Sequence, residues 1–537
     1  MHRIRAMQIS APLVSEPHPI LQRIEIASSR SIPSFHLIGL AGPEVAEARE
    51  RIRAAIEASD FEFPRRRVVI NLSPASVRKR GTGIDLAMAL AVLLSDLGPS
   101  PNFREIVAWG ELGLDGQVKP AGKLMRGIWA AWEAGAQALV LAAEEEEAAR
   151  ASVDMLKQTG HFSSAPPLLI GVDTLSEAWH YLKTGQLKPR KTHSIQRPDF
   201  PYAHRSKPET LPELRLAPQL ERLVSIAASG RHHLFLLGPR GAGKSHALEW
   251  LLALQPIPTP ELLVQKQLIA ELSGSCRLTE NRRVGAQCRP AALLGGTTAS
   301  SIRPGEFSLA HGGVLIADEL PEWPRDSRES LREPLEHHRV TITRAGGSLE
   351  LPARFVLAAN GNLCPCGGWP VGLGTRSAHS QRALAVPVCH CGFIERQRYW
   401  NRLSGPLLDR LDLCAIVNAE MPPAPGNDPK EVKKILESLR ERAALARSCA
   451  VKNWGKVGGD LPAEDLERLI AENPSWREHL DSNCTSLRSR HKILRVALSL
   501  CAWDGKASPR TSDFLEARIY RPEEIRKDLC ETEYIRK

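Results

Sequence analysis

A glycine-rich segment in the middle of the chain constrains the fold more than any other feature. Its pattern is Gly-x-x-x-x-Gly-Lys-Ser, formed by Gly238, Pro239, Arg240, Gly241, Ala242, Gly243, Lys244 and Ser245. An apolar run, 234–237, precedes the segment, and a helix-forming run, 247–252, follows it. Strand, loop and helix in this order are the setting in which the pattern binds phosphate. The sequence therefore predicts an α/β core with a parallel sheet and a nucleotide at this loop.

The residue types of the loop explain how it would hold ATP. Glycines let backbone N–H groups turn toward phosphate oxygens, and the N-terminus of the following helix adds a partial positive charge. Lys244 is predicted to reach the β and γ phosphates, and the Ser245 hydroxyl to bind Mg²⁺.

A second apolar run, 313–317, ends in two acids, Asp318 and Glu319. An acid at the end of such a strand can hold Mg²⁺, which is the role predicted for Asp318. Glu319 is predicted to polarise the attacking water as a general base. Combined with the phosphate loop, this pair predicts ATP hydrolysis rather than ATP binding alone.

Composition restricts the class of protein. The chain has 537 residues, a length typical of three or four domains, and it contains no apolar run long enough for a membrane span. A net charge of +10 and an isoelectric point near 9.1 permit a polyanionic partner. Eleven cysteines without a secretory signal favour a reducing compartment. We therefore expect a cytoplasmic protein with no membrane partner.

Two proline-rich stretches divide the chain. The polar, basic stretch 187–211 is predicted to be a linker, and the run 421–426 marks a second boundary. An α/β domain is expected over 1–186, the ATPase core over 212–425, and a helical lid over 426–537.

Longer motifs surround the two acids. They are 304–315 (Pro-Gly-Glu-Phe-Ser-Leu-Ala-His-Gly-Gly-Val-Leu), 318–323 (Asp-Glu-Leu-Pro-Glu-Trp), 331–336 (Leu-Arg-Glu-Pro-Leu-Glu) and 404–412 (Ser-Gly-Pro-Leu-Leu-Asp-Arg-Leu-Asp). These motifs resemble the magnesium-chelatase-like AAA+ ATPases, and the ComM-type branch of that family is similar over nearly the whole chain. The resemblance implies an AAA+ core, ATP and Mg²⁺ as cofactors, and a ring-forming homo-oligomer, expected to be a hexamer.

The same branch implies a function on DNA. Its members are understood as helicases that drive branch migration in natural transformation or recombination, so single-stranded or branched DNA is the expected partner. Two alternatives stay open at this point. One is a chelatase-type motor that inserts a metal into a tetrapyrrole, and the other is an ATP-gated scaffold without enzymatic activity.

The resemblance also assigns roles to residues outside the phosphate loop. Asn362 matches the sensor that orients the lytic water, with Asn360 as the alternative. Arg410 matches the arginine finger that reaches the neighbouring subunit's nucleotide; the alternative is a salt bridge on a helix surface. Arg488 matches the second sensor in the lid, and Arg490 is its close rival.

Residues 340–351 predict a β-hairpin with a glycine turn. In the related minichromosome-maintenance helicases, a hairpin at this point carries a basic residue into the ring pore. Arg344 holds that place here, which implies a contact with DNA. The alternative is an ordinary surface hairpin.

Four cysteines form two Cys-x-Cys pairs separated by 22 residues: Cys364, Cys366, Cys389 and Cys391. Four thiolates can bind one structural Zn²⁺ tetrahedrally, which is the prediction for this set. Reduced cysteines in a loop are the alternative.

The amino-terminal domain resembles the proteolytic domain of Lon proteases, which uses a serine and a lysine. Matching the two segments puts Gly83 at the serine position and Met125 at the lysine position. Neither side chain can perform that chemistry, so the chain is predicted not to be a peptidase. The chain also departs from the ATPase family at Arg240, at Pro218-Gln219, and over 282–287, where the Arg-x-Pro-His-His-Thr segment is absent.

Overall fold

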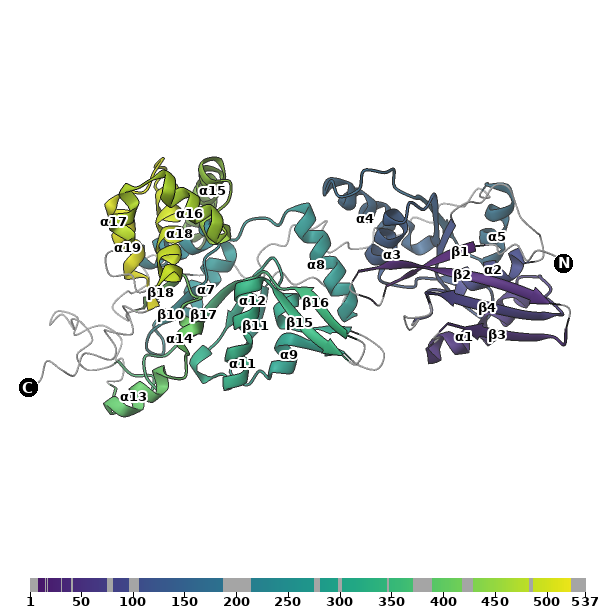
Figure 1. Ribbon diagram of the computed structural model, residues 1–537, viewed down its shortest axis with the longest axis horizontal. Helices are drawn as coiled ribbons and strands as arrows, with labels where there is room; N and C mark the ends of the chain where they lie inside the picture. Colours follow the sequence, from purple (N-terminus) through teal and green to yellow (C-terminus); the bar gives the residue numbers. More distant parts are fainter. Residues whose placement is uncertain are drawn as a thin grey trace, which may run out of the picture.

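The computed structural model describes residues 8–522 except for 15, 17, 30, 40–41, 75–80, 96–105, 187–213, 275–280, 298–301, 345–346, 370–388, 418–427 and 482–485. The chain is elongated, with an amino-terminal sheet at one end, helices α15 to α19 at the other, and a second sheet between them (Figure 1). This arrangement confirms the predicted α/β class with a parallel core and carboxy-terminal helices. The linker predicted at 187–211 lies outside the described residues.

The amino-terminal part is built on a seven-stranded mixed sheet in the order β3-β4-β2-β1-β5-β8-β9. Its strands are β1 (Gln8–Leu13), β2 (Ile20–Ser29), β3 (Ser34–Ile38), β4 (Arg67–Ser73), β5 (Ile106–Trp109), β8 (Ala138–Ala142) and β9 (Leu168–Val172). A short antiparallel pair, β6 (Glu111–Leu112) and β7 (Val118–Lys119), adjoins it. The pairs β1–β2 and β2–β4 are antiparallel, and the other pairs are parallel.

Five helices complete this part: α1 (Pro43–Ala58), α2 (Asp85–Leu94), α3 (Leu124–Glu133), α4 (Glu146–Gln158) and α5 (Leu175–Thr184). Every residue of α2 is buried. This helix packs between α1 and α5 and the strands β1, β2 and β5, so it forms the centre of the amino-terminal core.

The second sheet has five parallel strands in the order β11-β14-β17-β10-β18. They are β10 (Leu234–Leu237), β11 (Asn281–Val284), β14 (Val314–Ala317), β17 (Val356–Gly361) and β18 (Leu413–Ile416). The first strand in the chain, β10, therefore lies between the fourth and the fifth. In a parallel sheet, the crevice at the carboxyl ends beside such a change of strand order is the usual ligand site.

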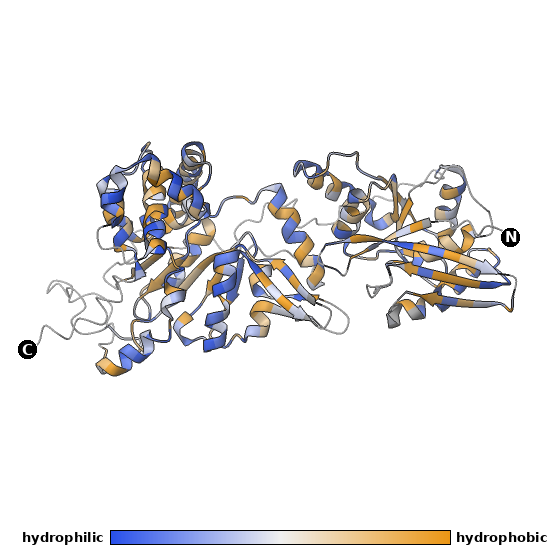
Figure 2. Cartoon of the chain, in the orientation of Figure 1, coloured by the Kyte–Doolittle hydropathy of each residue, from blue (hydrophilic) through white to orange (hydrophobic). Residues whose placement is uncertain are grey.

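Alternation along these strands divides the apolar side chains between two cores. Leu234 and Leu236 of β10 belong to a core shared with α6, α7 and the carboxy-terminal helices, whereas Phe235 and Leu237 belong to the core on the opposite face. Every residue of β10 and β14 is buried, and orange predominates along the middle of the second sheet in Figure 2, whereas blue and orange alternate along the long strands of the amino-terminal sheet. Because strands buried on both faces need apolar residues throughout, their sequences read as continuous apolar runs.

The remaining elements surround the second sheet. Its longer helices are α6 (Pro218–Gly230), α7 (Lys244–Ala253), α8 (Pro260–Ser273) and α13 (Phe393–Trp400). Short helices are α9 (Pro290–Leu294), α10 (Glu306–Leu309), α11 (Arg325–Ser330), α12 (Arg332–His337) and α14 (Gly405–Leu408). Two hairpins are β12 (Gly295–Thr297) with β13 (Ile302–Pro304), and β15 (Arg339–Arg344) with β16 (Gly347–Pro352).

The carboxy-terminal helices are α15 (Pro429–Trp454), α16 (Ala463–Glu472), α17 (Ser475–Asp481), α18 (Leu487–Trp503) and α19 (Thr511–Ile519). Among the described residues, no helix combines the length and the apolar character needed to cross a membrane.

Helix α8 connects the two sheet-containing parts (Figure 1). Glu271 on α8 is almost fully buried and accepts hydrogen bonds from the backbone N–H groups of Met125 and Arg126, both at 3.0 Å. These N–H groups belong to the first turn of α3, where they have no partner within the helix. The Arg126 guanidinium is 1% exposed and donates to the carbonyl of Leu268, also on α8, at 2.9 Å. The contact is therefore a buried polar interface that fixes α8 to the end of α3.

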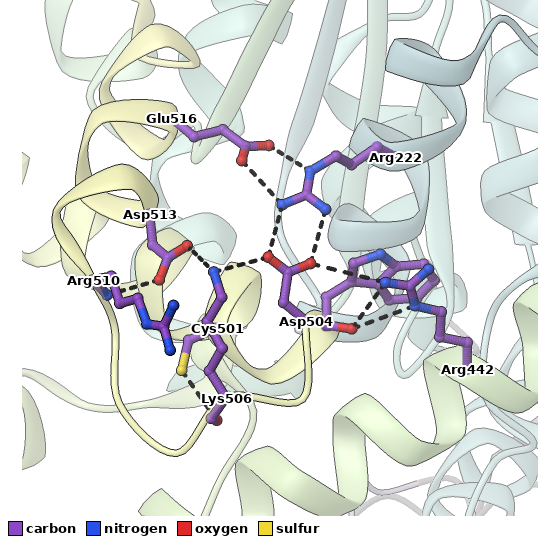
Figure 3. A network of polar contacts seen from close by, with 9 residues as sticks. Arg222, Arg442, Cys501, Asp504, Lys506, Arg510, Asp513 and Glu516 are labelled. Carbon is purple, nitrogen blue, oxygen red and sulfur yellow. Dashed lines mark hydrogen bonds and ion pairs between the residues drawn. The ribbon is translucent and has the colours of Figure 1, made fainter.

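A second polar network attaches α6 to the carboxy-terminal helices (Figure 3). Arg222 on α6 donates to Asp504 at 2.9 Å and to Glu516 at 2.8 Å. Lys506 bridges the Asp504 carboxylate to that of Asp513, with Nζ–O distances of 3.0 and 2.7 Å. The network holds the turn between α18 and α19 against α6.

We predict that Arg222→Ala lowers the free energy of unfolding of the carboxy-terminal part by about 1–2 kcal/mol, because two carboxylates lose charged hydrogen bonds. The measurement is urea denaturation followed by tryptophan fluorescence. Lys433→Ala is the control, since Lys433 and Glu437 are 4.0 Å apart and both more than half exposed. Such an exposed pair contributes little. Equal effects of the two substitutions would contradict the prediction.

Candidate nucleotide site

The phosphate loop lies between β10 and α7, at the carboxyl end of β10, which pairs with β17 on one side and β18 on the other. Gly241 and Gly243 have φ angles of +77° and +86°, which only glycine adopts without strain. Gly238 is needed for another reason, because a Cβ there would approach the carbonyl oxygen of Val417 to 2.5 Å. The backbone therefore requires glycine at all three positions.

Lys244 folds back over this loop. Its Nζ donates to the carbonyls of Gly238 and Pro239 at 2.7 and 2.8 Å, and it lies 3.3 Å from Oδ1 of Asn362. Burial lowers the pKa of the Lys244 ammonium to about 8. A half-buried cation whose hydrogen bonds go to neutral carbonyls and an amide is an arrangement suited to a phosphate anion.

The two acids follow β14. The Asp318 carboxylate accepts a hydrogen bond from the Asn360 amide at 2.8 Å, and Asn360 Oδ1 accepts one from the backbone N–H of Glu319, also at 2.8 Å. Glu319 has φ +51°, an uncommon backbone conformation for a residue with a side chain. Its carboxylate is exposed. Asn360 thus fixes the backbone from which the predicted base projects.

Both candidate sensor residues consequently lie in the site. Asn362 faces Lys244 of the phosphate loop, whereas Asn360 faces Asp318 and the Glu319 backbone. Asn362 remains the predicted sensor, with Asn360 as a structural partner of the acids.

Arg283 was missed by the reasoning from sequence. It lies on β11 beside β14, and its Nη1 is 3.6 Å from the Asp318 carboxylate. Its neighbour Arg282 makes two hydrogen bonds with Glu306, at 2.6 and 2.8 Å. Both arginines belong to the 282–287 segment that departs from the family pattern. Parallel pairing of β11 with β14 sets Arg283 against Ile316, close to the acids, and only the strand order shows this.

The oxygen atoms at the loop suit Mg²⁺ with ATP. Ser245 is exposed at the start of α7, and Asp318 directly follows β14, which is separated from β10 by β17. A hydroxyl and a carboxylate are the hard ligands that Mg²⁺ prefers when it also binds phosphates. These two residues would hold the ion, which would neutralise phosphate charge when bound.

The two arginines expected to act from outside the loop meet on one carboxylate. Arg410 and Arg488 both donate to Glu336 on α12, Arg488 at 2.5 Å. Arg410 is 9% exposed and also donates to the carbonyl of Arg332 at 3.1 Å. The rival Arg490 instead pairs with Asp481 at 3.2 Å. The salt bridge considered for Arg410 therefore exists, with Glu336 as its partner.

Helix α18 supports Arg410 from a second position. Lys492 Nζ donates to the backbone carbonyl of Arg410 at 2.9 Å and to the Asp412 carboxylate at 2.7 Å. Lys492 holds the pKa of the fully buried Asp412 well below its usual range. One face of α18 thus contacts Arg410 through both Arg488 and Lys492.

The predicted hairpin is present as β15 and β16. Arg344 ends β15 and pairs with Gly347 across the turn. This places the backbone of Arg344 at the tip, and its DNA role stays a prediction.

The four cysteines are brought together, with all four sulfur atoms within 4.8 Å of one another. Two follow β17 and two precede α13.

Packing restricts the side chain at position 83 in the amino-terminal part. A Cβ at Gly83 would lie 2.5–2.7 Å from atoms of the Trp109 ring, so no larger residue fits while Trp109 stays in place. Met125 is 1% exposed and its backbone N–H is bound by Glu271. Arg66 in the same part of the chain donates to the backbone carbonyl of Ser95 at 3.1 Å.

Comparison with known proteins finds magnesium-chelatase family profiles and relatives that match nearly the full length of the chain. The family profile described as magnesium chelatase, subunit ChlI, matches residues 211–423, and one described as subunit ChlI of Mg-chelatase matches residues 24–145. Competence protein ComM of Haemophilus influenzae is 28% identical over 96% of both chains. An uncharacterized protein of Mycobacterium tuberculosis is 31% identical over 93% of this chain and 95% of its own. YifB of Escherichia coli, also uncharacterized, is 28% identical over 97% and 96%.

We predict that Lys244→Ala abolishes tight nucleotide binding, because it removes the cation that faces the phosphates. Glu319→Gln should keep binding but lose hydrolysis, since only the base is removed. Binding of a fluorescent ATP analogue and phosphate release measure the two steps. Hydrolysis by Glu319→Gln at the wild-type rate would show that the base lies elsewhere.

We predict that Arg410→Ala nearly keeps nucleotide affinity but lowers turnover by about 10³-fold, as loss of an arginine finger does. Mixing it with Lys244→Ala subunits should restore part of the activity, because some interfaces then combine an intact loop with an intact finger. The measurement is ATPase rate against mixing ratio. No recovery at any ratio, in rings shown to have mixed, would exclude action across subunits.

Proposed function

Because the chain belongs to the magnesium-chelatase-like AAA+ ATPases, we propose that it is an ATP-driven motor acting on DNA, as a helicase or branch-migration factor in natural transformation or recombination. The observation that carries the ATP-driven part is the convergence of Lys244, Asp318, Glu319 and Asn362 at one edge of the parallel sheet. The proposed working form is a homo-oligomeric ring, a hexamer, in the cytoplasm. Its proposed cofactors are ATP with Mg²⁺ and a structural Zn²⁺ at the four cysteines.

DNA as the substrate is supported by three features. The first is the β15–β16 hairpin, which is inserted in the chain between β14 and β17 and has Arg344 at its tip. The second is the net charge of +10, which favours a polyanion. The third is similarity over nearly the full length to a protein named for competence. Single-stranded or branched DNA is the proposed form.

The proposed roles are divided among consecutive segments of the chain. We assign residues 1–186 to a degenerate Lon-protease-like domain, 187–211 to a linker, 212–425 to the ATPase core and 426–537 to the lid. The amino-terminal domain is proposed to serve as a scaffold without peptidase activity. The Trp109 ring leaves no room for a side chain at Gly83, and Met125 is buried.

The decisive experiment is steady-state ATP hydrolysis with and without forked, single-stranded and duplex DNA at low ionic strength. We expect forked or single-stranded DNA to raise the rate several-fold. Arg344→Ala should weaken that stimulation, since a phosphate contact is lost in each subunit. Arg339→Ala is the matched control, because Arg339 lies at the other end of β15 and pairs with Glu350 at 3.1 Å.

The outcomes separate the competing functions. Equal rates with and without every DNA would overturn the DNA assignment. Stimulation by a metal-free porphyrin instead of DNA would favour the chelatase-type motor. ATP binding without any hydrolysis would favour the non-enzymatic scaffold.

A further inference from the structure

The four cysteines lie beside the nucleotide site and not in a remote insertion. Cys364 and Cys366 follow directly on β17, the strand that carries Asn360, and Cys389 and Cys391 precede α13. Cys364 is fully buried and Cys389 is 7% exposed. None of the four forms a disulfide. The arrangement therefore gathers four free thiols at the end of a core strand.

The cluster meets the requirements of a tetrahedral metal site. A Zn–S distance of about 2.3 Å places ligand sulfurs about 3.8 Å apart. The sulfurs of Cys364 and Cys366 are 3.1 Å apart, and no pair of the four exceeds 4.8 Å, so the observed spacing brackets the required one. The backbone N–H of Gly368 points at Cys366 Sγ from 3.4 Å, which is the kind of outer contact that orients a thiolate ligand. A set of only cysteines leaves no open position, so it suits a structural zinc.

The turn that carries the first two cysteines touches the phosphate loop directly. The backbone N–H of Arg240 donates to the carbonyl of Gly367 at 3.3 Å. A Cβ at Gly367 would lie 3.0–3.3 Å from Cγ, Cδ and Nε of Arg240, so the arginine side chain covers this glycine. Gly367 also has φ +75°, a conformation that favours glycine. Arg240 is the loop residue at which this chain departs from its family, and it is the residue that makes the contact.

The same turn adjoins the predicted sensor. Asn362, two residues before Cys364, lies 3.3 Å from Lys244 Nζ. The carbonyl of Leu363 accepts a hydrogen bond at 3.1 Å from the indole of Trp400 on α13. The segment between the sensor and the cysteines is therefore held on one side by α13 and on the other by the loop.

We propose that the four cysteines bind one Zn²⁺ and that this zinc site forms a wall of the nucleotide site. Arg240 is the positioning residue: through its contact with Gly367, the bound zinc keeps the phosphate loop in place. The second part rests on the nucleotide site proposed above. When zinc is bound, the Cys366–Gly368 turn is fixed, and Gly367 holds the loop backbone at Arg240. Loss of the metal frees the turn, and the loop loses a backbone partner at its centre.

The first measurement is elemental analysis of protein purified without chelators, in which we expect about one zinc per chain. The double variant Cys366→Ser and Cys391→Ser should carry none, whereas Cys449→Ser should keep it. Cys449 is the control because it lies on α15, outside the cluster. Wild-type protein without zinc would overturn the metal site.

The second measurement is the Kd of fluorescent ADP. We expect the zinc-free double variant to bind about tenfold more weakly than wild type. Wild-type protein stripped with a chelator, then freed of it, should show the same loss, and added zinc should restore the affinity. This reversal excludes misfolding of the variant as the cause. An unchanged Kd in zinc-free protein would overturn the coupling and leave the metal site standing.

Arg240→Ala identifies the route of the coupling. The substitution removes the side chain that packs over Gly367 but keeps the backbone N–H that donates to the Gly367 carbonyl. The variant should therefore keep its zinc, and its Kd should change less than that of wild type when zinc is removed, so the two effects are only partly additive. Full additivity would overturn the role of Arg240. Wild-type protein that contains zinc but binds no nucleotide would instead refute the proposed ATPase function. Its zinc content would distinguish that result from a failure of the metal site.

Discussion

The parallel pairing of three strands places the phosphate loop, the two acids and the two asparagines of the candidate nucleotide site. Leu237 of β10 pairs with Gly361 of β17, and Ala317 of β14 pairs with Ala359 of the same strand. The chain leaves all three strands at one edge, so the phosphate loop, the two acids and the two asparagines emerge together. A shift of one residue in this register would turn each side chain to the opposite face and separate Lys244 from Asn362.

Polar contacts around this edge link the site to more distant parts. Glu336 holds Arg410 and Arg488 at once, and Lys492 fixes the Arg410 backbone from the same face of α18. The lid helix and the predicted finger therefore form one unit. If Arg410 acts on a neighbouring subunit, its guanidinium must leave the Glu336 carboxylate. Arg488 would then be the remaining one of the two arginines bound to Glu336. Helix α18 is therefore linked to Arg410 both through the Glu336 carboxylate and through Lys492.

Features encoded by neighbouring residues could be predicted from the sequence, and features that depend on distant contacts could not. The phosphate loop, the acid pair and the β15–β16 hairpin each lie within a short segment with its own signal. Glu336 lies 74 residues from Arg410 and 152 from Arg488, and nothing in those separations suggests a meeting. Arg283 and the contact between Arg240 and Gly367 likewise appear only once the strand order is known.

The start of α3 in the amino-terminal part holds the central part of the chain through backbone groups. The resemblance places Met125 where a Lon-type lysine would stand, at the start of α3. There its backbone N–H, with that of Arg126, is bound by the buried Glu271 of the ATPase core. A lysine ammonium at this buried position would also lose its hydration, which costs free energy without a catalytic partner. A side chain at position 83 would also meet the Trp109 ring. The start of α3 serves as the attachment point of α8.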